Sequence, residues 1–141
     1  MANYRFLPTW WAGTTTISPH NVEASVANGV DGGIPVLFRT ALADAATADY
    51  SITVPWAVRV VDFWIVKTAG NGAASNTVQL KSGANAITNS LDANVVDTTM
   101  VRASTIDDAR HELAAGGELR VTNTKSGGNA AAIAYTLCVR I

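Results

Sequence analysis

Hydrophobic and polar residues alternate along much of the chain from Ile34 onward, and this period of two predicts β-strands. The alternation is clear over residues 34–39, 50–54, 77–81 and 118–122. Turn-forming Gly, Asn, Ser and Asp residues separate the alternating segments. We therefore expect seven to nine short strands, with turns every ten or so residues, in an all-β sandwich or barrel.

Two longer segments have hydrophobic residues on more than one side. The segment 57–68 is the longest, and a strand that is apolar on both faces is central in a sheet or covered by a partner. Strict alternation places four of its residues on one face: Val58, Val60, Trp64 and Val66. The opposite face then holds Val61, Phe63 and Ile65.

The closing segment, residues 132–141, gives the clearest strand pattern in the chain. Large residues lie on one side of it: Ile133, Tyr135, Leu137, Val139 and Ile141. The other side carries Ala132, Ala134, Thr136, Cys138 and Arg140. Because Ala is a poor strand former, its abundance in this chain suggests places where sheets or subunits approach closely.

Only two short segments have a helical composition. Residues 41–48 are rich in Ala but lack an apolar stripe. Residues 106–115 follow Ser and Thr, carry Asp107 and Asp108 early, and precede two glycines. We expect one or two helical turns there at most.

The first 33 residues have a different character. Tyr4, Phe6, Trp10 and Trp11 occur among Pro, Gly and Thr with no period of 2 or 3.6. Aromatic residues without a period predict an extended arm that packs on a surface formed elsewhere. That surface is either the chain's own body or a neighbouring subunit, and the sequence leaves both possibilities open. We therefore divide the chain into an N-terminal arm, residues 1–33, and a β-domain, residues 34–141.

Charged residues are scarce in this chain, and their balance argues against nucleic acid and anionic membranes as partners. Charged residues make up 15% of the 141, against roughly 25% in an average domain. The formal net charge is −1, so the chain has no positive field for nucleic acid or an anionic membrane. No run of 18 apolar residues occurs, and the N-terminus lacks the apolar stretch of a signal peptide. We expect a single-domain product made in a cytosol, with neither nucleic acid nor membrane as a partner.

Candidate chemistry is sparse. A metal site needs clustered His, Cys or carboxylates, but His20 and His111 are isolated from each other and Cys138 is the single cysteine. A generous interpretation would build a nucleophilic site from Ser104, Asp107 and His111, whereas a capped turn explains the same residues with ordinary chemistry. No phosphate-binding loop occurs. We expect no catalytic residues, no metal and no cofactor.

The remaining features favour protein–protein contact. Interface cores are depleted in charge and enriched in Trp, Tyr and Phe, and this chain has few charges and four Trp. The residues we select as candidate partner contacts lie in the arm and on the long strand: Tyr4, Phe6, Trp10, Trp11 and Trp64.

Three segments, residues 34–38, 101–108 and 113–121, resemble the decoration (cement) proteins of tailed-bacteriophage capsids. With the closing strand they cover most of residues 34–141. The resemblance implies a jelly-roll of about eight antiparallel strands that assembles as a dimer or trimer on the exterior of the phage head. It implies a structural virion protein that bridges neighbouring major capsid proteins and stabilises the head, with an extended N-terminal arm. The virion would then be its location, after synthesis in the host cytoplasm.

An alternative function is a carbohydrate- or receptor-binding jelly-roll module of a phage tail or fibre. Exposed Trp10, Trp11 or Trp64 could stack on sugar rings, and the Asn-rich turns could hydrogen-bond their hydroxyls. This alternative predicts a glycan affinity that falls when one of these tryptophans becomes Ala.

Overall fold

All regular secondary structure is β in the computed structural model, which describes residues 34–70 and 75–141. Ten strands form one compact unit, Pro35–Arg140. Their bounds are β1 Pro35–Leu42, β2 Ala48–Thr53, β3 Val58–Lys67, β4 Thr77–Ser82, β5 Asn85–Ala86, β6 Leu91–Asp92, β7 Met100–Arg102, β8 Glu112–Leu113, β9 Glu118–Thr124 and β10 Ala132–Arg140. The all-β fold expected from the alternation is confirmed.

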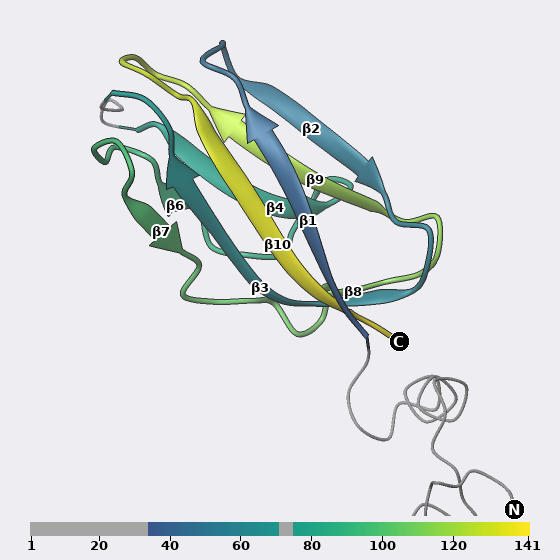
Figure 1. The fold of residues 1–141 in the computed structure, drawn as a ribbon. Coiled ribbons are helices and arrows are strands. Elements are labelled where there is room, and N and C mark those ends of the chain that lie inside the picture. The colour runs from purple at the N-terminus through teal and green to yellow at the C-terminus, as the bar shows by residue number, and fades with distance from the viewer. Residues whose placement is uncertain (1–33, 71–74) are drawn as a thin grey trace, which may run out of the picture. The chain divides into compact units, whose positions relative to one another are not determined.

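The strands form two antiparallel sheets (Figure 1). The first sheet has the order β1-β10-β3-β7, with β8 also paired to β3, and the second has the order β2-β9-β4-β5, with β6 also paired to β4. The pairing is nested: β1 with β10, β2 with β9, β3 with β7, and β4 with β6. Successive long strands β1 to β4 therefore alternate between the two sheets. Each of them pairs with a strand from the second half of the chain, taken in reverse order.

The hydrophobic core contains side chains of both sheets. Phe63 and Ile65 of β3 belong to the same buried cluster as Leu80 of β4 and Leu119 and Val121 of β9. Val78 and Leu80 of β4 and Leu119 and Val121 of β9 are buried, as the alternation predicts. The apolar positions of these strands therefore hold the second sheet against the first.

A β-bulge in β3 changes which residues face the core. Leu137 of β10 pairs with Asp62 and Cys138 pairs with Val60, so Val61 is an extra residue with no partner of its own. One extra residue reverses the alternation, and both halves of β3 thereby keep large hydrophobic residues inside. The buried residues of this strand are Val58, Val60, Phe63, Ile65 and Lys67. Our assignment of Trp64 and Val66 to the same face as Val58 and Val60 is therefore wrong.

The short helical segments expected from composition are absent from the described residues. Residues 43–47 form a loop of bends between β1 and β2. Residues 108–110 form a turn, in which the Asp107 carboxylate accepts a hydrogen bond from the Ala109 amide at 2.9 Å. The Asp107 amide is itself bound to the Ile87 carbonyl at 2.7 Å, and this pairing holds the chain extended just before the turn. Gly116, at φ 85°, forms a turn that leads into β9 rather than a helix end.

Two buried polar side chains fix the loop that precedes β10. Lys67 is 1% exposed, and its ammonium donates to the carbonyls of Ala69, Asn129 and Ala131. Burial lowers the pKa of this amine. On the other side of the loop, the Asn76 amide oxygen accepts from the Ser126 amide at 2.7 Å. These contacts set where β10 enters the first sheet.

Candidate interaction surface

Strand β10 has its small residues inside and its large residues outside. The buried side chains are Ala132, Ala134, Thr136 and Cys138, whereas Ile133, Tyr135, Leu137 and Val139 are only half-buried on the outer side. An antiparallel sheet with one solvated face normally shows the reverse arrangement, hydrophobic inside and polar outside. The outer side of β10 therefore has the composition of a protein interaction surface.

Neighbouring strands extend this surface across the first sheet. In the register of the sheet, Tyr135 lies between Arg39 of β1 and Trp64 of β3, while Leu137 lies beside Leu37 of β1. The next row joins Ile133 to Val66 of β3, and Val66 in turn pairs with Met100 of β7. We call this outer surface the apolar face: Leu37, Trp64, Val66, Met100, Ile133, Tyr135, Leu137 and Val139.

Two of these side chains, and Val61 at the bulge beside them, are well exposed in the isolated chain. Leu37 is 52% exposed and Met100 is 59% exposed, and Val61 at the bulge is 42% exposed. The tryptophan ring of Trp64 stacks on Tyr135 with centroids 5.3 Å apart and planes at 13°. This aromatic pair gives the middle of the apolar face a flat, rigid surface.

Charged side chains adjoin the hydrophobic row of β10: in register, Asp62 lies beside Leu137, Arg102 beside Trp64 and Arg39 beside Tyr135. Arg102 forms a two-point ion pair with Asp62, at 2.7 Å and 2.9 Å, and Arg59 binds Glu112 at 2.6 Å. The hydrogen bond to Asp62 raises the pKa of Arg102. The centre of the face, along β10, carries no charged side chain among residues 132–139. The uncharged part of the face is therefore the row of β10 itself, flanked by the ion pairs of β3 with β7 and β8 and by Arg39 of β1.

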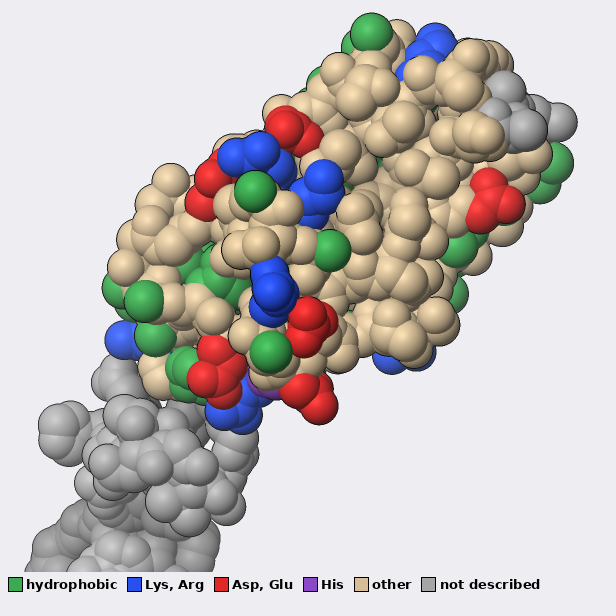
Figure 2. Space-filling model, turned by 180° about the vertical axis from the view of Figure 1, so that it is seen from behind, with side chains coloured by type: hydrophobic (Ala, Val, Ile, Leu, Met, Phe, Trp, Pro, Cys, Tyr) green, Lys and Arg blue, Asp and Glu red, His purple; other side chains and the backbone are tan. Residues whose placement is uncertain are grey.

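The outer side of the second sheet is entirely different. Its strands present Asp49 and Ser51 of β2, and Glu118, Arg120 and Thr122 of β9. Arg120 binds both Asp49 at 3.1 Å and Glu118 at 3.2 Å, and the Thr122 hydroxyl donates to Asp49 at 2.7 Å. Hydrogen bonds from Thr122 and Ser51 lower the pKa of the Asp49 and Glu118 carboxyl groups. Figure 2, seen from behind Figure 1, accordingly shows acidic and basic side chains side by side among neutral polar atoms.

We take the outer surface of the first sheet as the candidate functional site because it exposes large hydrophobic residues, which the outer surface of the second sheet does not. Large hydrophobic residues that are well exposed lie on β1, β3 and β7 of the first sheet, or in adjoining loops and chain ends. None lies on β2, β9 or β4 within residues 34–70 and 75–141. Contiguous exposed apolar patches mark interaction sites on soluble proteins.

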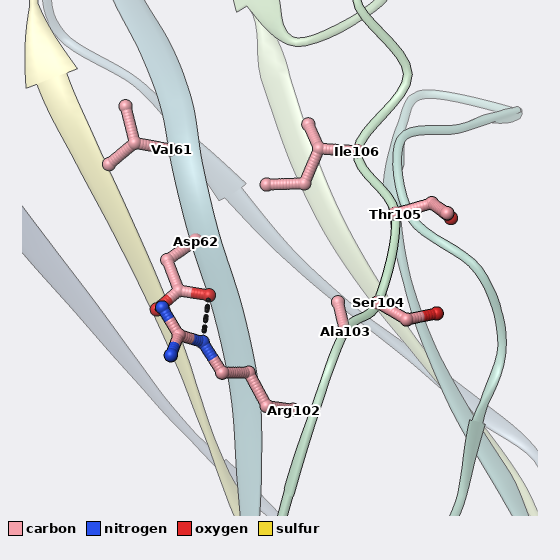
Figure 3. A pocket seen from close by; sticks show the side chains of 7 residues that line it. All are labelled: Val61, Asp62, Arg102, Ala103, Ser104, Thr105 and Ile106. Atoms are coloured by element: carbon pink, nitrogen blue, oxygen red, sulfur yellow. Dashed lines mark hydrogen bonds and ion pairs between the residues drawn. The ribbon is translucent and has the colours of Figure 1, made fainter.

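A shallow hollow lies beside the apolar face, between β3 and the loop after β7. Figure 3 shows Asp62 and Arg102 joined on one side of it, with the Ile106 side chain directed towards β3 and the hydroxyls of Ser104 and Thr105 directed away. The amides of Ser104 and Thr105 both donate to the Asn89 side chain, at 2.8 Å and 3.0 Å. The lining of the hollow is thus mixed, with the ion pair and polar groups beside the hydrophobic side chains of Val61 and Ile106.

Of the five contact residues selected from sequence, the structure places one. Tyr4, Phe6, Trp10 and Trp11 lie outside the described residues. Trp64 lies on the apolar face, where Tyr135 occupies one side of its ring, so a sugar could stack on only the other side. Sequence reasoning did not select Leu37, Leu137, Tyr135 or Met100. The alternation of small and large residues in the closing strand was the available signal for two of these.

The residues considered for catalysis are dispersed or occupied. Asp107 pairs with Arg110 at 3.3 Å. His111 lies beside Asp108, with 3.6 Å between its Nδ1 and the carboxylate. Burial raises the pKa of Cys138 to about 12, and this thiol faces the core. Within the described residues no three His, Cys, Asp or Glu side chains are grouped closely enough to ligate a metal.

No helix in the described part of the chain is both long and apolar enough to cross a membrane. Comparisons of the chain with family models, curated proteins and solved structures gave no match.

Proposed function

We propose that this protein is a structural component of a larger assembly and works by protein–protein contact through its apolar face. The carrying observation is the outward placement of the large residues of β10. On an open sheet face, the half-buried row of Ile133, Tyr135, Leu137 and Val139 leaves hydrophobic area in water, and cover by another protein surface would stabilise it.

The strand arrangement supports a jelly-roll as the fold of this component. A jelly-roll consists of eight strands in two sheets built from two Greek keys. The nested pairs β1–β10, β2–β9, β3–β7 and β4–β6 supply four strands to each sheet, with β5 and β8 as short additions.

The assembly we propose is the exterior of a tailed-phage head, where the chain cements neighbouring major capsid proteins. Three observations support this function. The sequence resembles phage decoration proteins, charged residues are few, and the described surface divides into one apolar face and one self-satisfied polar face. A cement protein needs firm protein contacts and no reaction chemistry, and the apolar face offers such contacts.

The arm, residues 1–33, is our candidate for a further contact with the capsid, through Tyr4, Phe6, Trp10 and Trp11. The test compares the full chain with a variant lacking residues 1–19, each added to phage heads that lack the protein. Circular dichroism first establishes that both proteins are folded. We expect the full chain to coat the heads and raise their heat resistance, and the truncated chain to bind more weakly. Coating at full occupancy by the truncated chain would remove the arm from the proposal, and failure of the full chain to bind heads would refute the capsid function.

A further inference from the structure

Strand β1 forms a long open edge of the first sheet. It is the terminal strand on the side away from β7, and within the described residues it pairs with β10 alone (Figure 1). The pairing covers all eight residues of the strand, Pro35–Leu42. The strands at the opposite edge are short, because β7 has three residues and β8 has two. An open strand edge carries backbone N–H and C=O groups that can pair with a further strand.

The direction of the backbone groups in β1 follows from hydrogen bonds elsewhere in the sheet. The Ala103 amide donates to the Phe63 carbonyl at 2.9 Å, so Phe63 bonds towards β7. In an antiparallel sheet successive residues bond to opposite sides, so the next residue, Trp64, bonds towards β10. Trp64 is opposite Tyr135, and Tyr135 therefore bonds to β3. Its neighbour Thr136 then bonds to β1.

This alternation leaves every second residue of β1 with free backbone groups. Thr136 is opposite Phe38, so Phe38 and the residues two positions away from it bond to β10. The N–H and C=O groups of Leu37, Arg39 and Ala41 point to the open edge, where the described residues provide no further strand. The side chains of these three residues are exposed as well.

The corresponding edge of the second sheet, strand β2, is better protected. The Val54 amide donates to the Gly117 carbonyl at 2.9 Å, so the backbone groups of Asp49, Ser51 and Thr53 point to that open edge. The side chains of Asp49 and Ser51 are already bonded to charged side chains of β9. Charged and polar side chains of this kind protect natural sheet edges from further pairing.

Strand β1 has a single charged side chain along its edge, and this charge is unpaired. Arg39 has no ion-pair partner within the described residues, and it lies between Leu37, which is 52% exposed, and the small side chain of Ala41. Opposite charges on neighbouring strands stabilise a sheet, so the Arg39 guanidinium matches a carboxylate on an added strand. Because Leu37 belongs to the apolar face, a strand added here would also extend that face.

We infer that an extended segment of the partner protein adds to β1 as a further strand of the first sheet, with a carboxylate of that segment opposite Arg39. In such strand addition the main-chain hydrogen bonds give affinity, and the side chains of alternate residues give specificity. The inference rests on the proposed function, under which the partner is the major capsid protein. It adds to that function a docking edge and the chemistry of the segment that occupies it.

The first test is hydrogen exchange of the full chain, free and bound to phage heads that lack the protein, read by mass spectrometry at the amides of β1. In the free chain we expect fast exchange at Leu37, Arg39 and Ala41, and slow exchange at the residues that bond to β10. On heads, we expect exchange at these three amides to slow by about 100-fold or more. Fast exchange that persists on heads would overturn the inference.

The free chain also tests other occupants of the edge. Slow exchange at Leu37, Arg39 and Ala41 before any heads are added would overturn the inference, because the edge would already be occupied. Sedimentation velocity would then identify the occupant as a second copy if the chain is a dimer, or as a segment of the same chain if it is a monomer.

The second test uses matched variants. Ala41→Pro removes an N–H that faces the open edge and leaves the bonds to β10 in place, and Thr53→Pro makes the same change at the edge of β2. Arg39→Glu reverses the unpaired charge, Arg39→Lys retains it, and Lys81→Glu reverses a charge on the second sheet. Circular dichroism and urea unfolding establish which variants are folded.

We expect the dissociation constant for heads to rise by about 10-fold or more for Ala41→Pro and for Arg39→Glu. Thr53→Pro, Lys81→Glu and Arg39→Lys should change it by less than about threefold. If Ala41→Pro does not fold, Arg39→Glu and the exchange measurement still decide the matter. Wild-type affinity in the folded β1 variants would overturn the inference.

Binding to heads separates this inference from the proposed function. A chain that coats heads while the β1 edge stays in fast exchange would refute strand addition and leave the cement function standing. A chain that does not coat heads would refute the cement function, and strand addition by a capsid segment with it.

Discussion

The inward face of β10 should tolerate no added volume, and Ala134→Leu tests this directly. Ala134 is 1% exposed and lies in register between Thr40 of β1 and Ile65 of β3. The substitution adds three carbon atoms, which would contribute about 2 kcal/mol if the core had space for them. The core is close-packed, so the added atoms displace neighbours and we expect a net loss of about 1–3 kcal/mol in the free energy of unfolding.

Urea unfolding followed by tryptophan fluorescence measures this loss, at several protein concentrations so that association is separated from folding. The control is Ile133→Leu, which changes only the shape of a neighbouring outward side chain and should shift stability by less than about 0.5 kcal/mol. If Ala134→Leu were neutral or stabilising with an unchanged m-value, the small residues of β10 would not be at a tight sheet-to-sheet contact. The assignment of inner and outer faces would then lose its physical basis.

Three further predictions concern single side chains. Asn76→Ala removes the acceptor for the Ser126 and Gly127 amides, so urea unfolding should show a loss of about 1–3 kcal/mol; an unchanged midpoint would mean that this loop does not depend on Asn76. Burial raises the pKa of Cys138 to about 12, so Ellman's reagent should react with the thiol only in denaturant, and rapid reaction of the native chain would contradict its burial. The hydrogen bond from Lys125, followed by that from the Ala130 amide, lowers the pKa of Asp44 below 3.8. The stability it contributes is therefore present above pH 3.8 and lost as the pH falls through the lower folded pKa, so acid should destabilise the wild-type chain more steeply than Asp44→Asn.

The alternation of residue types was sufficient to predict the long strands and, in β4 and β9, also their inner sides. Val78 and Leu80 of β4 and Leu119 and Val121 of β9 are buried as predicted, because a regular pleat preserves the period of two. In β3 the same reasoning failed after Val60. The bulge at Val61 adds one residue, and nothing in a run of hydrophobic residues marks where the parity changes.

Other features were beyond sequence reasoning because they depend on distant partners. The segment 106–115 has good helix-capping chemistry, but pairing of Ile106 with Thr88 and of Asp107 with Ile87 holds its start extended. Lys67 lies at a core-facing position of β3, and its burial requires carbonyls from residues 69, 129 and 131 that only the fold brings together.

The sequence showed that the closing strand has one side of large residues and one of small residues, but it did not show which side faces the core. Ordinary hydrophobic reasoning would place the large side inside. The structure places the small side inside, where Ala132, Ala134 and Cys138 lie beside the bulky residues of β3 in the same sheet and share one core with those of the second sheet. The outer row of β10 is uncharged, whereas the strands on either side of it carry Arg39, Arg59, Asp62 and Arg102.

The central claim is that the apolar face is covered when this protein performs its function. Hydroxyl-radical footprinting of the chain bound to phage heads, compared with the free chain, tests it most directly. We predict that Met100, Leu37 and Tyr135 are strongly protected from oxidation in the assembly, while Lys81 and other side chains of the second sheet's polar surface react equally in both samples. Equal oxidation of Met100, Leu37 and Tyr135 in the two samples would contradict the claim.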